Sequence, residues 1–389
     1  MVRASWLTGL LLVAVGAAAA PYQVTRRPIA YTGADAGFQG WSEVSLSPDG
    51  RLVAFVDERE AEGTGNTYDL VVATIHGQRL VTRRGYFQTP RWSPGGKRLG
   101  YLSDLGLCTM RPDGSDAGVR VRHRTSYDWS WSPDGRHLAF LRHGDLWVAD
   151  PDGQHQRCLL RGKERLSYAW ARDGRHLTAS HDQVYVQEKA WWQTPRAWLI
   201  TLATGRASLV TSPSKGQRVA DCGLSPDGGT LALVCAGSYR KTAYGARRDL
   251  SLWLRDLATG AARRVTTDTG EGARLLWSPD GSRLAWCVAL EGGCCGGEQR
   301  FSLWSAAGQR LSGAIKGYPK QWSPGGKRLL FGRHSDGCGH NDYVCDHVGQ
   351  RVTLAGVMGD GPGGSCWLPD GLGLLVAHGQ SIATVMLGP

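Results

Sequence analysis

A short phrase recurs eight times along this chain of 389 residues, and it limits the possible folds more than any other feature. In each copy an apolar residue, usually Trp, precedes Ser-Pro-Asp-Gly or a close variant, and a polar residue and an apolar run follow. The apolar residues that begin the copies are Leu46, Trp92, Trp131, Trp170, Leu224, Trp277, Trp322 and Trp367. Neighbouring copies lie 39 to 54 residues apart, which is typical of one supersecondary unit repeated around an axis or along a solenoid.

Each copy predicts a tight hairpin turn. Pro at the second position presets φ, Asp at the third tolerates the bridge region, and Gly at the fourth accepts a positive φ. Two copies depart from this pattern, because Arg172 replaces Pro in the fourth and Leu368 replaces Ser in the eighth. We expect looser turns there.

The segments on both sides of each turn are predicted to be strands. The apolar run at 138–141 is too short for a helix and has turn signals at both ends. A further strand at 145–150 follows, then a second turn at Asp152-Gly153 and a fourth strand. Four antiparallel strands per unit with no helix between units predict an all-β fold, a single β-propeller built of four-stranded blades.

The phrase Trp-Ser-Pro-Asp-Gly-(Lys/Arg)-x-Leu-Ala-Phe, as at 131–140, resembles the TolB-type propeller repeat. That repeat is a bacterial relative of the WD repeat and also forms the propeller domains of prolyl oligopeptidase-family peptidases. The resemblance implies one propeller domain over residues 21–389, with repeats centred near 46, 92, 131, 170, 224, 277, 322 and 367. It is specific for the fold and not for a function.

The copy number predicts eight blades, with seven as the alternative if a terminal copy does not close. The last copy supplies only three strands, at about 365–367, 372–377 and 381–387. A candidate fourth strand, at 28–32, precedes the first copy. Pairing this N-terminal strand with the last blade would close the ring and leave no exposed sheet edge.

The N-terminus has the order of charge, apolar core and small residues that a secretory signal peptide requires. Arg3 precedes an apolar stretch at 6–15 and small residues at 16–20. The stretch is short for a bilayer span, although a retained membrane anchor is the alternative. We therefore predict a signal peptide over residues 1–20 and a periplasmic or secreted protein.

Export would permit disulfides among the ten cysteines. Cys338 and Cys345 flank a probable hairpin loop in the seventh blade and are the best candidate pair. The same segment holds His340 and His347, but its spacing matches no standard zinc pattern. We predict neither a metal nor another cofactor.

All eight Ser-Pro-Asp-Gly turns should lie on one face of the ring, here called the turn face. Cations follow several of these turns and contribute to the net charge of +11: Arg51, Lys97, Arg98, Arg136, Arg175, Arg283, Lys327 and Arg328. They could form a basic ring that binds anions, or they could simply be solvated residues at strand starts.

The opposite face, here called the long-loop face, carries the connections from second to third strand. These connections are long in blades one, four, five, six and seven, and variable loops on a rigid repeated scaffold often bind partners. Aromatic and basic residues, which frequently anchor interfaces, occupy two neighbouring insertions: Trp191 and Trp192 in blade four, and Tyr239, Arg240, Lys241, Tyr244, Arg247 and Arg248 in blade five. We predict that these residues bind a partner, the alternative being that the two Trp residues cap the core of their own blade.

Four histidines should also reach the long-loop face, because each follows the second strand of its blade: His143, His181, His334 and His378. Acids lie near three of them, at Asp145, Asp182 and Asp336. Such groups could bind a metal or transfer protons. Equivalent positions on distant blades would nevertheless be far apart, which favours ordinary exposed loop residues.

The chain contains no Gly-x-Ser-x-Gly elbow, phosphate-binding loop or zincin motif. We therefore predict an exported, non-catalytic, monomeric scaffold that binds a protein or cell-envelope component through the long-loop face. Peripheral contact with an anionic surface is expected, and nucleic-acid binding is not. The alternative is a metal-dependent lyase or hydrolase acting on acidic oligosaccharides. A basic protein with a pI near 9.3 would attract such substrates.

Overall fold

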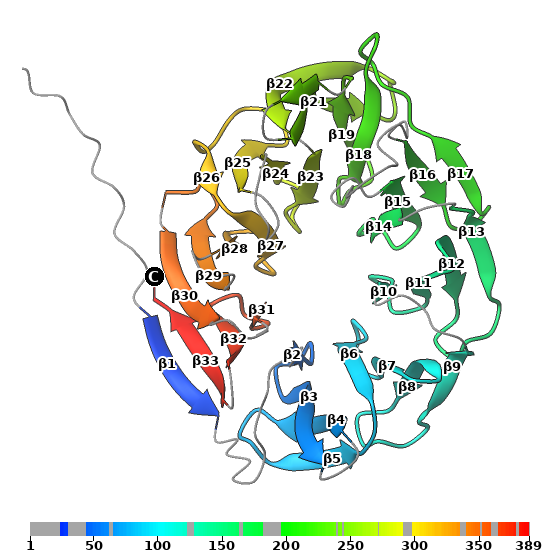
Figure 1. The fold of residues 1–389 in the computed structure, drawn as a ribbon, viewed down its shortest axis with the longest axis vertical. Coiled ribbons are helices and arrows are strands. Elements are labelled where there is room, and N and C mark those ends of the chain that lie inside the picture. Colours follow the sequence, from blue (N-terminus) through cyan, green and yellow to red (C-terminus); the bar gives the residue numbers. More distant parts are fainter. Residues whose placement is uncertain are drawn as a thin grey trace, which may run out of the picture.

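The chain forms a ring of eight four-stranded antiparallel sheets around a central axis (Figure 1). The computed structural model describes residues 24–29, 44–61, 65–122, 128–162, 166–181, 196–238, 240–242, 245–270, 272–290, 298–334, 340–350, 352–358, 365–378 and 381–388. Every regular element in these ranges is a β-strand. The predicted eight-bladed β-propeller is therefore confirmed.

The first four blades follow one another along the chain. Blade one contains β2 (Val44–Leu46), β3 (Leu52–Ala61), β4 (Gly65–Thr74) and β5 (Arg79–Arg83). Blade two contains β6 (Phe87–Trp92), β7 (Leu99–Ser103), β8 (Gly106–Met110) and β9 (Gly118–Arg122). Blade three contains β10 (Trp129–Trp131), β11 (Leu138–Arg142), β12 (Asp145–Ala149) and β13 (Arg157–Leu160). Blade four contains β14 (Leu166–Trp170), β15 (His176–His181), β16 (Ala197–Thr201) and β17 (Arg206–Leu209).

The remaining blades include one with an extra strand and one completed by the N-terminus. Blade five contains β18 (Arg218–Leu224), β19 (Thr230–Ala236), β21 (Gly245–Asp256) and β22 (Ala262–Gly270), with the added strand β20 (Arg240–Thr242). Blade six contains β23 (Gly272–Trp277), β24 (Arg283–Ala289), β25 (Gln299–Ser305) and β26 (Ile315–Lys316). Blade seven contains β27 (Tyr318–Trp322), β28 (Arg328–His334), β29 (His340–Asp346) and β30 (Val352–Met358). Blade eight contains β31 (Ser365–Trp367), β32 (Gly373–His378), β33 (Ser381–Leu387) and β1 (Val24–Ile29).

The N-terminal strand closes the ring. Strand β1 pairs antiparallel with β33 over six residue pairs, from Val24 opposite Leu387 to Ile29 opposite Ile382. Figure 1 shows β1 as the outermost strand of blade eight, beside the C-terminal strands. The predicted closure is confirmed, although the strand begins four residues earlier than the sequence suggested.

The eight repeated turns share one geometry at the inner end of each blade. In the third copy the Gly135 N–H donates to the Ser132 carbonyl at 2.8 Å, and the Ser132 N–H donates to the His137 carbonyl at 2.8 Å. The Ser132 hydroxyl donates to Asp134 at 2.6 Å and accepts the His137 N–H at 2.9 Å. The fourth-position glycines of all eight copies have φ between 65° and 76°.

The expectation that copies four and eight are looser was wrong. Gly174 donates to the Ala171 carbonyl at 3.1 Å and Gly371 donates to the Leu368 carbonyl at 2.9 Å, so both turns close as the others do. In copy four the carboxylate of Asp173 accepts the His176 N–H at 3.1 Å. This bond replaces the one that the serine hydroxyl accepts in the copies that begin with Ser. The backbone bonds and the glycine therefore suffice for closure.

Hydrophobic residues are buried between the blades rather than in one central core. Eight clusters fill the eight interfaces, and one of them packs Leu250 and Leu252 of blade five against Trp286 and Val288 of blade six. Each blade thus depends on both neighbours for burial of its faces. This arrangement makes the propeller one domain.

Candidate functional site

The insertion of blade five forms a β-hairpin that extends the blade on the long-loop face. Strand β20 pairs with the first residues of β21, in the register Arg240 opposite Arg247 and Thr242 opposite Gly245. Strand β21 is therefore 12 residues long, whereas the equivalent strand of blade three has five. The hairpin places Arg240 and Arg247 on paired strands.

Two arginines face each other across this hairpin. The side chain of Arg240 is 72% exposed and forms an ion pair with Asp249, which is 50% exposed. Arg247, directly opposite Arg240, is also exposed. Like charges at directly opposed positions destabilise a strand pair. Asp249 offsets part of this repulsion at Arg240, and the hairpin presents two exposed arginines at opposed positions.

Arg248 does not belong to this exposed surface, contrary to its inclusion among the predicted binding residues. It is only 3% exposed, and its burial lowers the pKa of the guanidinium to about 10. The cause is strand alternation, which turns Arg248 toward the side opposite to Arg247. Trp191, Trp192, Tyr239 and Tyr244 lie outside the described residues, as does the side chain of Lys241.

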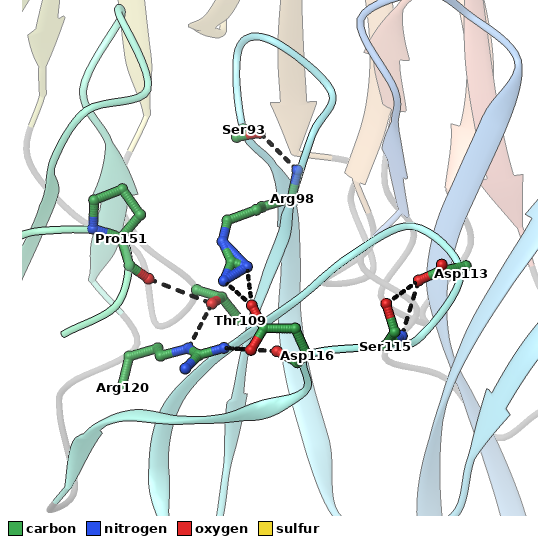
Figure 2. Close-up of polar contacts among 8 residues, drawn as sticks. All are labelled: Ser93, Arg98, Thr109, Asp113, Ser115, Asp116, Arg120 and Pro151. Carbon is green, nitrogen blue, oxygen red and sulfur yellow. Dashed lines mark hydrogen bonds and ion pairs between the residues drawn. The ribbon is translucent and has the colours of Figure 1, made fainter.

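The turn-face cations do not form a continuous basic ring. Arg98 forms an ion pair with Asp116, which also pairs with Arg120, as Figure 2 shows. The Arg120 Nε donates to the Thr109 hydroxyl at 2.9 Å, and that hydroxyl donates to the Pro151 carbonyl at 3.3 Å. Because Pro151 belongs to blade three, this network fastens blade two to its neighbour.

Two further turn-face arginines also make structural contacts. Arg328 of blade seven donates to the carbonyls of Leu372 and Gly388 in blade eight, and Arg283 pairs with Asp280 of its own turn at 3.5 Å. The other cations of the predicted ring are exposed: Arg51, Lys97, Arg136, Arg175 and Lys327. At least three of the eight cations therefore hold the fold together.

The four histidines lie at equivalent strand ends, as predicted, on blades three, four, seven and eight. His181, His334 and His378 end β15, β28 and β32, and His143 follows β11. Among the described residues no three His, Cys, Asp or Glu side chains gather in a way that could hold a metal ion. The side chains of His181, His334 and His378 lie outside the described part of the structure, so the metal hypothesis for these histidines stays untested.

The described cysteines are free thiols. They are Cys108, Cys158, Cys222, Cys235, Cys287, Cys345 and Cys366. Cys345, half of the expected Cys338–Cys345 pair, lies in β29 opposite Leu329 and is packed among Phe301 and Phe331. Burial raises the pKa of this thiol, which makes it an unreactive core residue. Its partner Cys338 lies outside the described residues.

One titratable group that the sequence did not single out joins three blades. Asp221 of β18 accepts the Ser180 hydroxyl of blade four at 3.2 Å and the Leu275 N–H of blade six at 3.2 Å. Removal from water raises the pKa of this carboxyl to about 6. No sequence signal identified Asp221, because its partners come from blades that are 41 and 54 residues away.

No helix in the described part of the chain is long and apolar enough to cross a membrane. The predicted signal peptide lies outside those ranges and stays a prediction. No family model matches the chain, and no curated protein matches it.

Solved structures share the fold at low sequence identity. The Dos1 propeller is 13% identical over 94% of this chain and 95% of that one, with a TM-score of 0.58. An oligogalacturonate lyase in complex with manganese is 14% identical over 95% and 97% of the two chains, with a TM-score of 0.50. TolB from Acinetobacter baumannii is 12% identical over 78% and 79%, and its TM-score of 0.41 is too low to support an argument. The comparisons thus agree with a propeller and leave the function open between binding and catalysis.

Proposed function

We propose that this propeller is an exported, non-catalytic scaffold that binds an anionic protein or cell-envelope partner through the blade-five hairpin. The observation that carries the proposal is the cross-strand pair of exposed arginines, Arg240 and Arg247, on strands β20 and β21. Arginine recognises carboxylate and phosphate groups through a rigid fork of donors.

The test is capture of a partner from cell-envelope extracts by the purified protein, compared between the wild type and two variants. We expect Arg240→Glu combined with Arg247→Glu to lose the captured partner, because reversal of two charges opposes an anionic surface. Arg136→Glu is the matched control, since Arg136 is 82% exposed on the turn face. If the hairpin variant captures as much partner as the control does, the proposed interface is wrong.

The lyase alternative has a direct test of its own. Incubation of the purified protein with polygalacturonate and Mn²⁺ should produce no new unsaturated ends, which absorb in the ultraviolet. Depolymerisation that disappears in His334→Ala or His181→Ala would establish the enzyme instead of the scaffold.

A further inference from the structure

On the third strand of every blade, one of the core positions that face the following blade can be compared across the ring. It pairs with the second-strand residue that lies nine positions after the first residue of the blade's Ser-Pro-Asp-Gly turn. In seven blades it is apolar and at most 4% exposed: Leu70, Leu107, Leu146, Ala197, Leu252, Phe301 and Ile382. In blade seven it is Asp342, which pairs with Gly332 and is 0% exposed. A carboxylate therefore replaces a core side chain at the interface of blades seven and eight.

Asp342 is only half satisfied by its surroundings. Its Oδ1 accepts a hydrogen bond from the Lys320 ammonium at 2.6 Å, whereas its Oδ2 is buried with no hydrogen-bond partner among the described residues. Lys320 lies in a β-bulge of β27, the innermost strand of blade seven, and its side chain is 28% exposed. The pair thus connects the buried carboxylate with solvent.

The facing blade presents a second unsatisfied group. Ser365 of β31 has a buried hydroxyl that lacks a hydrogen-bond partner among the described residues. It lies two residues from Trp367, which packs against Leu330 and Val344 of blade seven. Asp342 likewise lies two residues from Val344, so alternation of the strands places Asp342 and Ser365 in the same interface. Asp342 and Ser365 both lie on the side of this cluster that is farther from the turn face.

The side chain of Tyr318 lies near Lys320 and Gly332 and also packs against the core between blades six and seven. Tyr318 lies over Gly332, because a Cβ atom at that glycine would be 2.5 Å from the Tyr318 Cζ. The Tyr318 ring is half-buried, and the Lys320 ammonium lies 5.7 Å from its centroid. Gly332 thus leaves room for this ring. At the equivalent position each of the other seven blades carries a larger residue: Val56, Leu102, Leu141, Ser180, Val234, Cys287 and Ala377.

This arrangement is unfavourable for stability alone. A buried ion pair is often less stabilising than apolar residues of similar volume, and a half-satisfied polar group in the core adds a further penalty. Buried polar groups that lack part of their hydrogen bonds are expected where a protein binds a ligand. The buried lone pairs of Asp342 and the hydroxyl of Ser365 therefore point to a ligand.

The chemistry of the groups limits the ligand class. Lysine only donates hydrogen bonds, a carboxylate only accepts them, and a serine hydroxyl does both. Lys320 and Asp342 together carry no net charge, so neither an anion nor a cation is favoured. A hydroxyl group can donate to Asp342 and accept from Lys320, and the Tyr318 ring offers an apolar surface for the carbon skeleton beside it.

We propose that the interface between blades seven and eight, on the side away from the turn face, binds a neutral, hydroxyl-bearing ligand such as a sugar or polyol. The ligand approaches past Lys320, donates a hydrogen bond to Asp342 Oδ2 and reaches Ser365. This site lies on different blades from the arginine hairpin and does not depend on the function proposed for that hairpin.

The test combines ligand binding with thermal stability. Binding of D-glucose and glycerol to the full-length mature protein is measured by saturation-transfer NMR, with inorganic phosphate and methylamine as charged probes. We expect binding of at least one neutral probe to the wild-type protein and none to Asp342→Leu. Combining Asp342→Leu with Lys320→Met replaces the whole ion pair by apolar side chains, so the Tm of this double variant should be equal to that of the wild type or higher.

Two further variants keep the test decisive. Asp342→Asn should weaken binding of the neutral probes even if the leucine variant does not fold. Asp268→Leu, which removes the partner of Arg300 between blades five and six, should leave their binding unchanged. Absence of neutral-probe binding to the wild type, binding of only a charged probe, or equal binding by Asp342→Leu would overturn the proposal. The first of these results would mean that ordered water alone satisfies Asp342 and Ser365.

Discussion

At the residue scale, the repeated Trp joins each blade to the one before it. Five of the six repeat tryptophans donate their indole N–H to the carbonyl just before the equivalent residue of the preceding blade, with distances of 2.9 to 3.1 Å. For example, Trp131 donates to the Arg91 carbonyl at 3.0 Å. Trp170 is the exception, because its indole nitrogen is buried with no hydrogen-bond partner in the part of the chain that the structure describes. Tyr168 binds the preceding blade instead, through the Ala139 carbonyl at 2.9 Å.

This difference yields a matched pair of substitutions. We expect Trp131→Phe to lower the free energy of unfolding by about 1 to 3 kcal/mol, because the Arg91 carbonyl loses its donor and packing is reduced. Trp170→Phe also reduces packing but removes no hydrogen bond, so its loss should be smaller. Urea unfolding followed by far-UV circular dichroism measures both values. A loss for Trp170→Phe as large as that for Trp131→Phe would argue against a role for the indole bond.

At the element scale, the repeated turns contact one another as well as closing their own hairpins. A Cβ atom added to Gly135 would lie 3.5 Å from Pro94 of the preceding turn, and one added to Gly50 would lie 3.3 Å from Pro369. The turns of successive blades therefore touch around the inner rim of the ring. The fourth position of the turn favours glycine chiefly because φ is positive there, at 69° in Gly135.

The turn of blade two offers an internal control for this requirement. Gly135→Ala should reduce the free energy of unfolding by about 1 to 2 kcal/mol, because a side chain disfavours the left-handed region. Gly95→Ala occupies the third turn position, where an added Cβ meets nothing within 4 Å. It should be neutral or stabilise the protein by less than about 1 kcal/mol. If urea unfolding gave equal losses of free energy for Gly135→Ala and Gly95→Ala, the glycine requirement at the fourth turn position would be wrong.

At the scale of the whole molecule, stability depends on closure of the ring by a strand distant in sequence. Without β1, blade eight would have three strands and would expose the edge of β33. An exposed edge presents unpaired backbone groups and promotes pairing with other chains. The interface between blades seven and eight also carries the Lys320–Asp342 pair in place of an apolar contact.

Truncation tests the role of closure. We expect removal of residues 1–29 to lower the Tm by at least about 5 °C and to produce oligomers, because six residue pairs of the β1–β33 ladder are lost. Removal of residues 1–20, which precede the strand, should leave both properties unchanged. Calorimetry and size-exclusion chromatography measure the two effects. An unaltered Tm in the longer truncation would show that closure contributes little.

The sequence by itself determined the fold, because its information is local and repeated. A turn such as Ser132–Gly135 is specified by four adjacent residues, and eight copies set the number and phase of the blades. The same information placed Arg240 and Arg247 in one insertion of the long-loop face. Other features depend on contacts between residues far apart in the chain, and only the tertiary structure decided them. Strand alternation buries Arg248 while it exposes Arg247. Asp221 joins blades four and six. Asp342 occupies a core position that can be recognised only after the eight blades are compared in register.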